Sequence, residues 1–111
     1  MTALDFPQRR ATALALLLGL GLAPPAGAQT PASAGQQLAT KYCAYCHVVT
    51  PSGSGGWTNA PAFQTIAGNK HFTAASLSAF IQTQHEKMLN TGRPRNESDD
   101  IAAYIISLRR Q

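Results

Sequence analysis

The spacing of apolar side chains predicts helices along this chain, and no stretch shows the alternation typical of a β-strand. One helix is expected over residues 35–46, with Ser33 as its natural N-cap. A second is expected from the N-cap Thr73 to about Gln84. Both patterns repeat every three or four residues, which indicates helices with one buried face.

The last helix has the clearest start, because Asn96 can cap it and three acidic residues follow within four positions. A short helix is expected over 61–67, whereas Gly, Pro and Asn mark 48–60 and 85–95 as loops. The side chains expected to face the core are Leu38, Tyr42, Tyr45, Leu77, Phe80, Ile81, Ile101, Tyr104, Ile105 and Leu108. The predicted fold class is all-α.

The N-terminal segment has the composition of an export signal. Arg9 and Arg10 precede an apolar run over 11–23, which is too short to span a bilayer, and 26–28 has the A-x-A pattern of a cleavage site. A short buried helix is the alternative, but caps and an amphipathic pattern are missing. The arginine pair also raises twin-arginine export, although its surroundings fit that signal poorly. We expect a Sec-type signal peptide at 1–28 and a periplasmic protein without membrane insertion.

The remaining chain is small. Residues 29–34 are expected to form a flexible leader, and 35–111 one domain. After signal removal about 83 of the 111 residues remain, and a domain of that size buries too little apolar surface to be stable without help. Its two cysteines are the only side chains able to form a covalent clamp. We therefore expect a cofactor to complete the core and folding to depend on it.

The charge of the mature part is modestly positive. Seven Lys or Arg side chains stand against four Asp or Glu, a formal charge of +3. The cations are scattered, which argues against nucleic-acid binding. They suit docking to the acidic surface of another protein, and we expect the protein itself to be a monomer.

The chemistry is carried by Cys43-Ala44-Tyr45-Cys46-His47. C-x-x-C-H is the pattern of covalent haem c attachment: two thiols reach the porphyrin vinyl groups, and the next histidine binds the iron. A thioredoxin-like pair would need β-strands around it. A zinc site would need a second ligand pair, which is missing.

The iron needs a second axial ligand, and Met88 is the candidate. It is the only methionine after signal removal and lies in a polar loop, about forty residues beyond His47. A methionine that fills a gap in the core is the ordinary alternative. His85 is the rival ligand and His71 a weaker one; either would give a lower potential.

The chain resembles the small class I monohaem cytochromes c of bacteria across 33–110. The resemblance rests on Gly35 through the C-x-x-C-H motif, on the proline segment 60–63, on the H-x-x-M segment 85–88 and on the C-terminal helix 101–108. It implies the small cytochrome c fold, in which the N- and C-terminal helices cross and haem lies in the core.

The resemblance also implies roles for single residues. Gly35 would let the first helix cross the last one at Tyr104. The carbonyl of Pro61 would accept a hydrogen bond from Nδ1 of His47. One departure is Leu89, which follows the methionine where family members usually have proline.

Other side chains could bind the haem propionates. Trp57, Arg93 and Arg95 are candidates, and Trp57 could equally cover a small core. A closed six-coordinate iron predicts a one-electron carrier and not an enzyme. Two alternatives stay open: an electron-transfer subunit of a periplasmic dehydrogenase or oxidase, and a ligand-binding or peroxidase-like haem protein in which Met88 leaves the iron.

Overall fold

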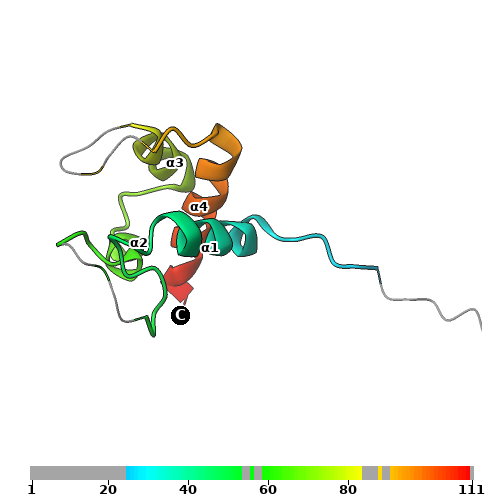
Figure 1. Ribbon diagram of the computed structural model, residues 1–111, viewed down its shortest axis with the longest axis horizontal. Helices are drawn as coiled ribbons and strands as arrows, with labels where there is room; N and C mark the ends of the chain where they lie inside the picture. The colour runs from blue at the N-terminus through cyan, green and yellow to red at the C-terminus, as the bar shows by residue number, and fades with distance from the viewer. Residues whose placement is uncertain (1–24, 54–55, 57–58, 84–87, 89–90, 111) are drawn as a thin grey trace, which may run out of the picture.

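The computed structural model describes residues 25–53, 56, 59–83, 88 and 91–110. Within these ranges the chain forms α1 (Pro31–Tyr42), α2 (Phe63–Gly68), α3 (Ala74–Gln82) and α4 (Arg95–Ser107), followed by the 3-10 turn η1 (Leu108–Arg110), and no strand. This confirms the all-α class (Figure 1). No helix in the described ranges is both long and apolar enough to cross a bilayer.

The first helix begins earlier than expected. Thr30, and not Ser33, is the N-cap, and its side chain accepts a hydrogen bond from the Ser33 backbone N–H at 3.2 Å. Pro31 occupies the first helical position, where its fixed φ suits the helix and its missing N–H does no harm. Residues 31–34 are therefore helical, although the sequence analysis assigned them to the leader.

The start of α4 also differs from the prediction. Arg95 is its first residue and Pro94 takes the N-cap position without a side-chain cap, so Asn96 lies inside the first turn and caps nothing. Of the acidic residues, only Glu97 lies in that turn. Proline at 94 sets an extended entry to the helix, and the N-cap lies two residues earlier than the Asn96 signal indicates.

The N-cap predicted for α3 is confirmed. The Thr73 hydroxyl accepts from the Ser76 N–H at 3.1 Å, and the Ser76 hydroxyl accepts from the Thr73 N–H at 2.9 Å. This reciprocal capping box satisfies two backbone donors that the first turn leaves without helical partners. The helix ends at Gln82, and its predicted end at 84 lies outside the described residues.

The fold is organised around α4. Helices α1 and α3 both pack against it, α1 crossing it, while α2 packs against its C-terminal part and η1 (Figure 1). Most of the side chains predicted to face the core do so. The buried apolar side chains are Ala39, Val49, Phe63, Ala67, Leu77, Ile81, Ile101, Ala102, Tyr104, Ile105 and Leu108.

Three aromatic side chains predicted to face the core are instead exposed. Tyr45 is 74% exposed, because α1 ends at Tyr42 and helical spacing no longer applies beyond it. Tyr42 is 44% exposed; its ring lies against cationic side chains and not in the core. Phe80 is 43% exposed, with its ring 6.0 Å from that of Phe72.

The crossing of α1 and α4 depends on Gly35. A Cβ atom placed on this buried glycine would collide with the backbone carbonyl of Asp100 and lie 2.8 Å from Cβ of Tyr104. No side chain larger than hydrogen fits there without moving a helix. The contact implied by the family resemblance is therefore present.

Two side chains of the C-terminal region fasten other segments to it. The Tyr104 hydroxyl donates to the Val49 carbonyl at 2.7 Å, inside the core. The Arg109 guanidinium donates to the carbonyls of Ala67, Asn69 and Phe72 at 2.6 to 2.7 Å. Arg109 thus satisfies carbonyls at the end of α2 and in the connection to α3, which the sequence analysis did not foresee.

Candidate functional site

The C-x-x-C-H motif forms the turn that directly follows α1. The Cys43 N–H donates to Ala39 O at 2.8 Å and closes the helix. The N–H groups of Cys46 and His47 then both donate to Cys43 O, at 3.1 and 2.9 Å. Both cysteines are partly buried, and no disulfide joins them. One tight turn therefore holds two thiols and an imidazole.

The imidazole of His47 is oriented by Pro61. Its Nδ1 lies 2.7 Å from the Pro61 carbonyl oxygen. A carbonyl only accepts, so Nδ1 carries the proton and Nε2 keeps its lone pair for a metal. The hydrogen bond implied by the resemblance is thus formed, and it fixes both the tautomer and the ring.

Helix α2 supports this arrangement. The Phe63 N–H donates to Val48 O at 2.9 Å, which ties the start of α2 to the residue after His47. The Phe63 ring is buried, with its centroid 5.3 Å from that of His47 and 6.4 Å from that of Tyr104. The proline segment therefore approaches the motif by backbone pairing and aromatic packing together.

Gly56 brings the following loop close to the same turn. Its φ of 92° lies in the left-handed region, and a Cβ there would be only 3.0 Å from Cys46 O. Both observations favour glycine. In the sequence Gly56 is one of several loop glycines, and neither its φ nor its contact with Cys46 can be predicted from composition.

The Cys43 thiol lies in an apolar environment. Burial raises the pKa of the Cys43 thiol to about 11, partly opposed by the positive charge of Arg93. Cys43 is thus protonated at neutral pH, and because the thiolate is the reactive form, it is a poor nucleophile toward disulfides. Its side chain packs against the hydrophobic core, which is the cause of this burial.

The predicted second ligand is only partly described. Met88 is partly buried, while His85, Leu89 and Trp57 lie outside the described residues. His71 is exposed, and its backbone N–H donates to the side chain of Asn69 at 3.0 Å. No cluster of three His, Cys, Asp or Glu side chains suited to a metal occurs in the described ranges.

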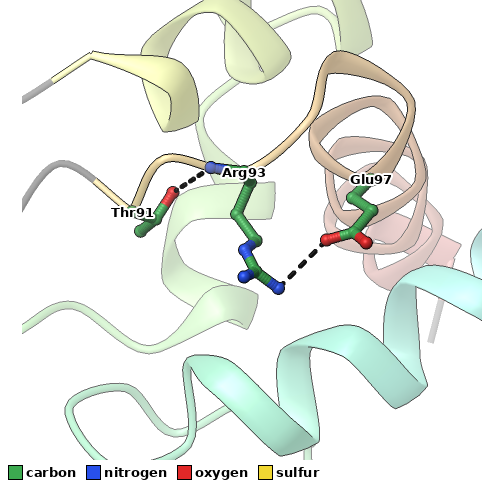
Figure 2. Close-up of polar contacts among 3 residues, drawn as sticks. All are labelled: Thr91, Arg93 and Glu97. Atoms are coloured by element: carbon green, nitrogen blue, oxygen red, sulfur yellow. Dashed lines mark hydrogen bonds and ion pairs between the residues drawn. The ribbon is translucent and has the colours of Figure 1, made fainter.

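Arg93, predicted to bind haem, contacts two other side chains. Its Nη1 lies 3.0 Å from Oε2 of Glu97 (Figure 2). Its Cζ lies 3.9 Å from the centroid of the Tyr42 ring. The Arg93 and Lys41 side chains lower the pKa of the Tyr42 phenol, with Arg93 the larger cause. Sequence reasoning missed this cluster because its members belong to three different segments.

The residues present fit haem c. Two cysteines without a disulfide and a histidine whose Nε2 is available stand in the attachment turn. A methionine sulfur, which is a ligand of haem iron, is present beyond α3. Apolar side chains that are only partly buried, among them Leu38, Ile66 and Phe72, border the core.

Comparison with known proteins agrees with this geometry. The chain is 33% identical over 96 residues to cytochrome c-552 of Bradyrhizobium diazoefficiens, which covers 86% of this chain and 92% of the relative. No family model matches the chain. No solved structure matches it either. With the attachment turn, the oriented histidine and the crossing helices in place, this likeness shows that the chain belongs to the small class I cytochrome c family and is an electron carrier with covalently bound haem c.

Proposed function

We propose that the protein is an exported monohaem cytochrome that carries single electrons between redox partners in the periplasm. Cys43 and Cys46 would form the thioethers that hold the haem, and His47 and Met88 would be the protein ligands of its iron. Haem iron, when bound, supplies the one-electron chemistry. If both protein ligands stay on the iron in both oxidation states, no position on the iron is left for a substrate. The protein would then be an electron carrier and not an enzyme.

The observation that carries the proposal is the hydrogen bond between His47 Nδ1 and the Pro61 carbonyl, 2.7 Å long. It sets the tautomer in which Nε2 can bind iron, and it does so one residue after two cysteines at the attachment spacing. A thioredoxin-like disulfide-exchange pair does not require a histidine whose ring is oriented by a backbone carbonyl. The rest of the chain then excludes water and presents the cofactor to partners.

The attachment predicts that haem stays with the polypeptide after denaturation. The exported protein should retain haem peroxidase stain on a denaturing gel, because thioether bonds survive detergent and heat. Cys43→Ala and Cys46→Ala should each leave one thioether and lower the yield. Ser52→Ala, an exposed position, serves as the expression control. A protein band without stain would end the haem c assignment.

Partner recognition is proposed to use the surface beside the attachment turn. Lys41 is exposed there, and the rings of Tyr42 and Tyr45 are 44% and 74% exposed. Exposed aromatic rings with a neighbouring cation suit an acidic partner that also offers apolar contact. Residues 25–30 run away from the start of α1, so this N-terminal stretch lies at the end of the helix opposite the attachment turn (Figure 1).

A charge-reversal pair tests this surface. Lys41→Glu should slow oxidation of the ferrous protein by ferricyanide about twofold to fivefold at low ionic strength. The reason is that the ferricyanide anion is attracted less to the surface beside the attachment turn. Lys70→Glu changes the net charge equally at an exposed position between α2 and α3, and should have a smaller effect. Equal slowing in both variants would mean that net charge alone acts.

A further inference from the structure

Three side chains from three segments meet beside the attachment turn. Tyr42 is the last residue of α1, Glu97 lies in the first turn of α4, and Arg93 lies in the segment that joins Met88 to α4. Figure 2 shows the Arg93 side chain reaching from this segment toward Glu97, with α1 running below it. We name the three side chains the Arg93 anchor.

The contacts of the anchor are short. The guanidinium lies 3.0 Å from the Glu97 carboxylate and 3.9 Å from the centre of the Tyr42 ring. The Arg93 and Glu97 side chains are only 24% and 30% exposed, so solvent screens their pair less than it screens a fully exposed one. In the segment that precedes α4, the backbone N–H of Arg93 donates to the Thr91 hydroxyl at 3.4 Å.

Arginine suits this position for a geometric reason. Its planar group can lie over an aromatic ring and still direct N–H donors sideways to a carboxylate. A lysine ammonium is a point charge and cannot form both contacts with the same geometry. Lys41 shows the difference on the same ring, since its Nζ lies 5.0 Å from the Tyr42 centroid.

The anchor bears directly on Met88. Arg93 follows Met88 by five positions, so the chain lets their Cα atoms lie at most about 18 Å apart. Arg93 holds the far end of this short segment against both α1, one residue before Cys43, and α4. Without it, residues 91–94 would keep their covalent link to α4 but lose the contact of Arg93 with Tyr42 of α1.

We propose that Arg93 is a positioning residue: by holding residues 91–94 against α1, it keeps the Met88 sulfur in place as iron ligand. This inference rests on the proposed function, in which Met88 binds the iron. It gives Arg93 a role different from the propionate contact expected on the sequence. The role is carried by two contacts formed within the protein itself.

Imidazole binding to the ferric protein tests the proposal, because imidazole competes with the methionine for the iron. Arg93→Ala should raise the apparent imidazole affinity about threefold to tenfold and weaken the red absorption band of sulfur-bound ferric iron. Tyr42→Leu and Glu97→Gln should also raise the apparent imidazole affinity, but by a smaller factor. Arg93→Lys should lie between Arg93→Ala and the native protein.

Arg110→Ala is the matched control. It removes the same charge from an exposed side chain in η1, to which no role at the haem is assigned, and should leave imidazole affinity and the red band unchanged. Unfolding midpoints measured on all variants separate positioning from general stability. A lower midpoint for Arg93→Ala with native imidazole affinity would overturn the proposal.

Two further results would also overturn it, and each has its own signature. If the native ferric protein lacks the red band, Met88 is not the ligand, and the proposed ligation fails together with the positioning role. If the band is present but Arg93→Ala changes only the pH dependence of the potential, Arg93 acts on a haem propionate. Only higher imidazole affinity for Arg93→Ala, with Arg110→Ala unchanged, supports the anchor.

Discussion

Gly35→Ala is expected to destabilise the protein, although alanine in place of glycine normally stabilises a helix by about 0.5–1 kcal/mol. The added Cβ would meet the Asp100 carbonyl and lie 2.8 Å from Cβ of Tyr104. A backbone carbonyl cannot rotate away as a flexible side chain can, so α1 and α4 must separate. Overpacking of this kind lowers the free energy of unfolding by about 1–3 kcal/mol, and Gly35→Val should exceed Gly35→Ala.

Thermal unfolding of the holoprotein is the measurement. For a domain of this size each kcal/mol corresponds to about 4–8 °C in the melting temperature. Gly68→Ala is the control, because no described atom lies within 4 Å of a Cβ built at the end of α2. That variant should melt at or above the native temperature. A Gly35→Ala protein that melts no lower than native would show that the helices do not cross as closely as described.

The sequence predicted the helices of the core well and their ends less well. The stripe of Ile101, Tyr104, Ile105 and Leu108 is buried as expected, because four apolar side chains at helical spacing leave little choice of face. The helix starts were set by proline instead. At Pro31 and Pro94 the fixed φ and missing N–H favour the helix boundary. Ser33 and Asn96, the expected N-caps, therefore lie inside the helices.

The parts of the site formed by neighbouring residues in the sequence could be predicted. The contacts between segments far apart in the sequence could not. The attachment turn lies within five consecutive residues, and the Pro61 contact of His47 followed from family resemblance. The contact of Arg93 with Tyr42 spans half the chain, and nothing in the spacing of either residue indicates it. The same holds for Arg109, whose partners are backbone carbonyls and carry no side-chain signature.

The polar pair of Ser78 on α3 and Asp99 on α4, of which only the serine is buried, gives a further example. Ser78 is 1% exposed, and its hydroxyl donates to Asp99 Oδ1 at 2.5 Å. The sequence analysis assigned Asp99 to the helix start, where its charge would favour the dipole. In the structure it accepts from a neighbouring helix, which removes the unfavourable burial of an unpaired hydroxyl.

Replacement of Met88 by histidine is expected to lower the redox potential strongly. A thioether is a soft donor that favours ferrous iron, so histidine and methionine ligation gives a higher potential than two histidines. Met88→His should lower the midpoint by on the order of 0.2 V, within the range of about 0.8 V that axial ligands cover. The red band of sulfur-bound ferric iron should disappear. Potentiometry with visible spectra measures both.

Met88→Ala and two histidine variants separate the possible ligands. Met88→Ala should open the sixth position, so that the reduced protein binds CO rapidly, and slow peroxidase activity is expected to arise with it. His71→Ala is the control, since that side chain is exposed, and it should leave spectrum and potential unchanged. His85→Ala should also be silent. If His85→Ala instead alters the ferric spectrum while Met88→Ala leaves it intact, the ligand is His85. If neither variant changes it, neither residue binds the iron, and the open site would favour a ligand-binding haem protein over a carrier.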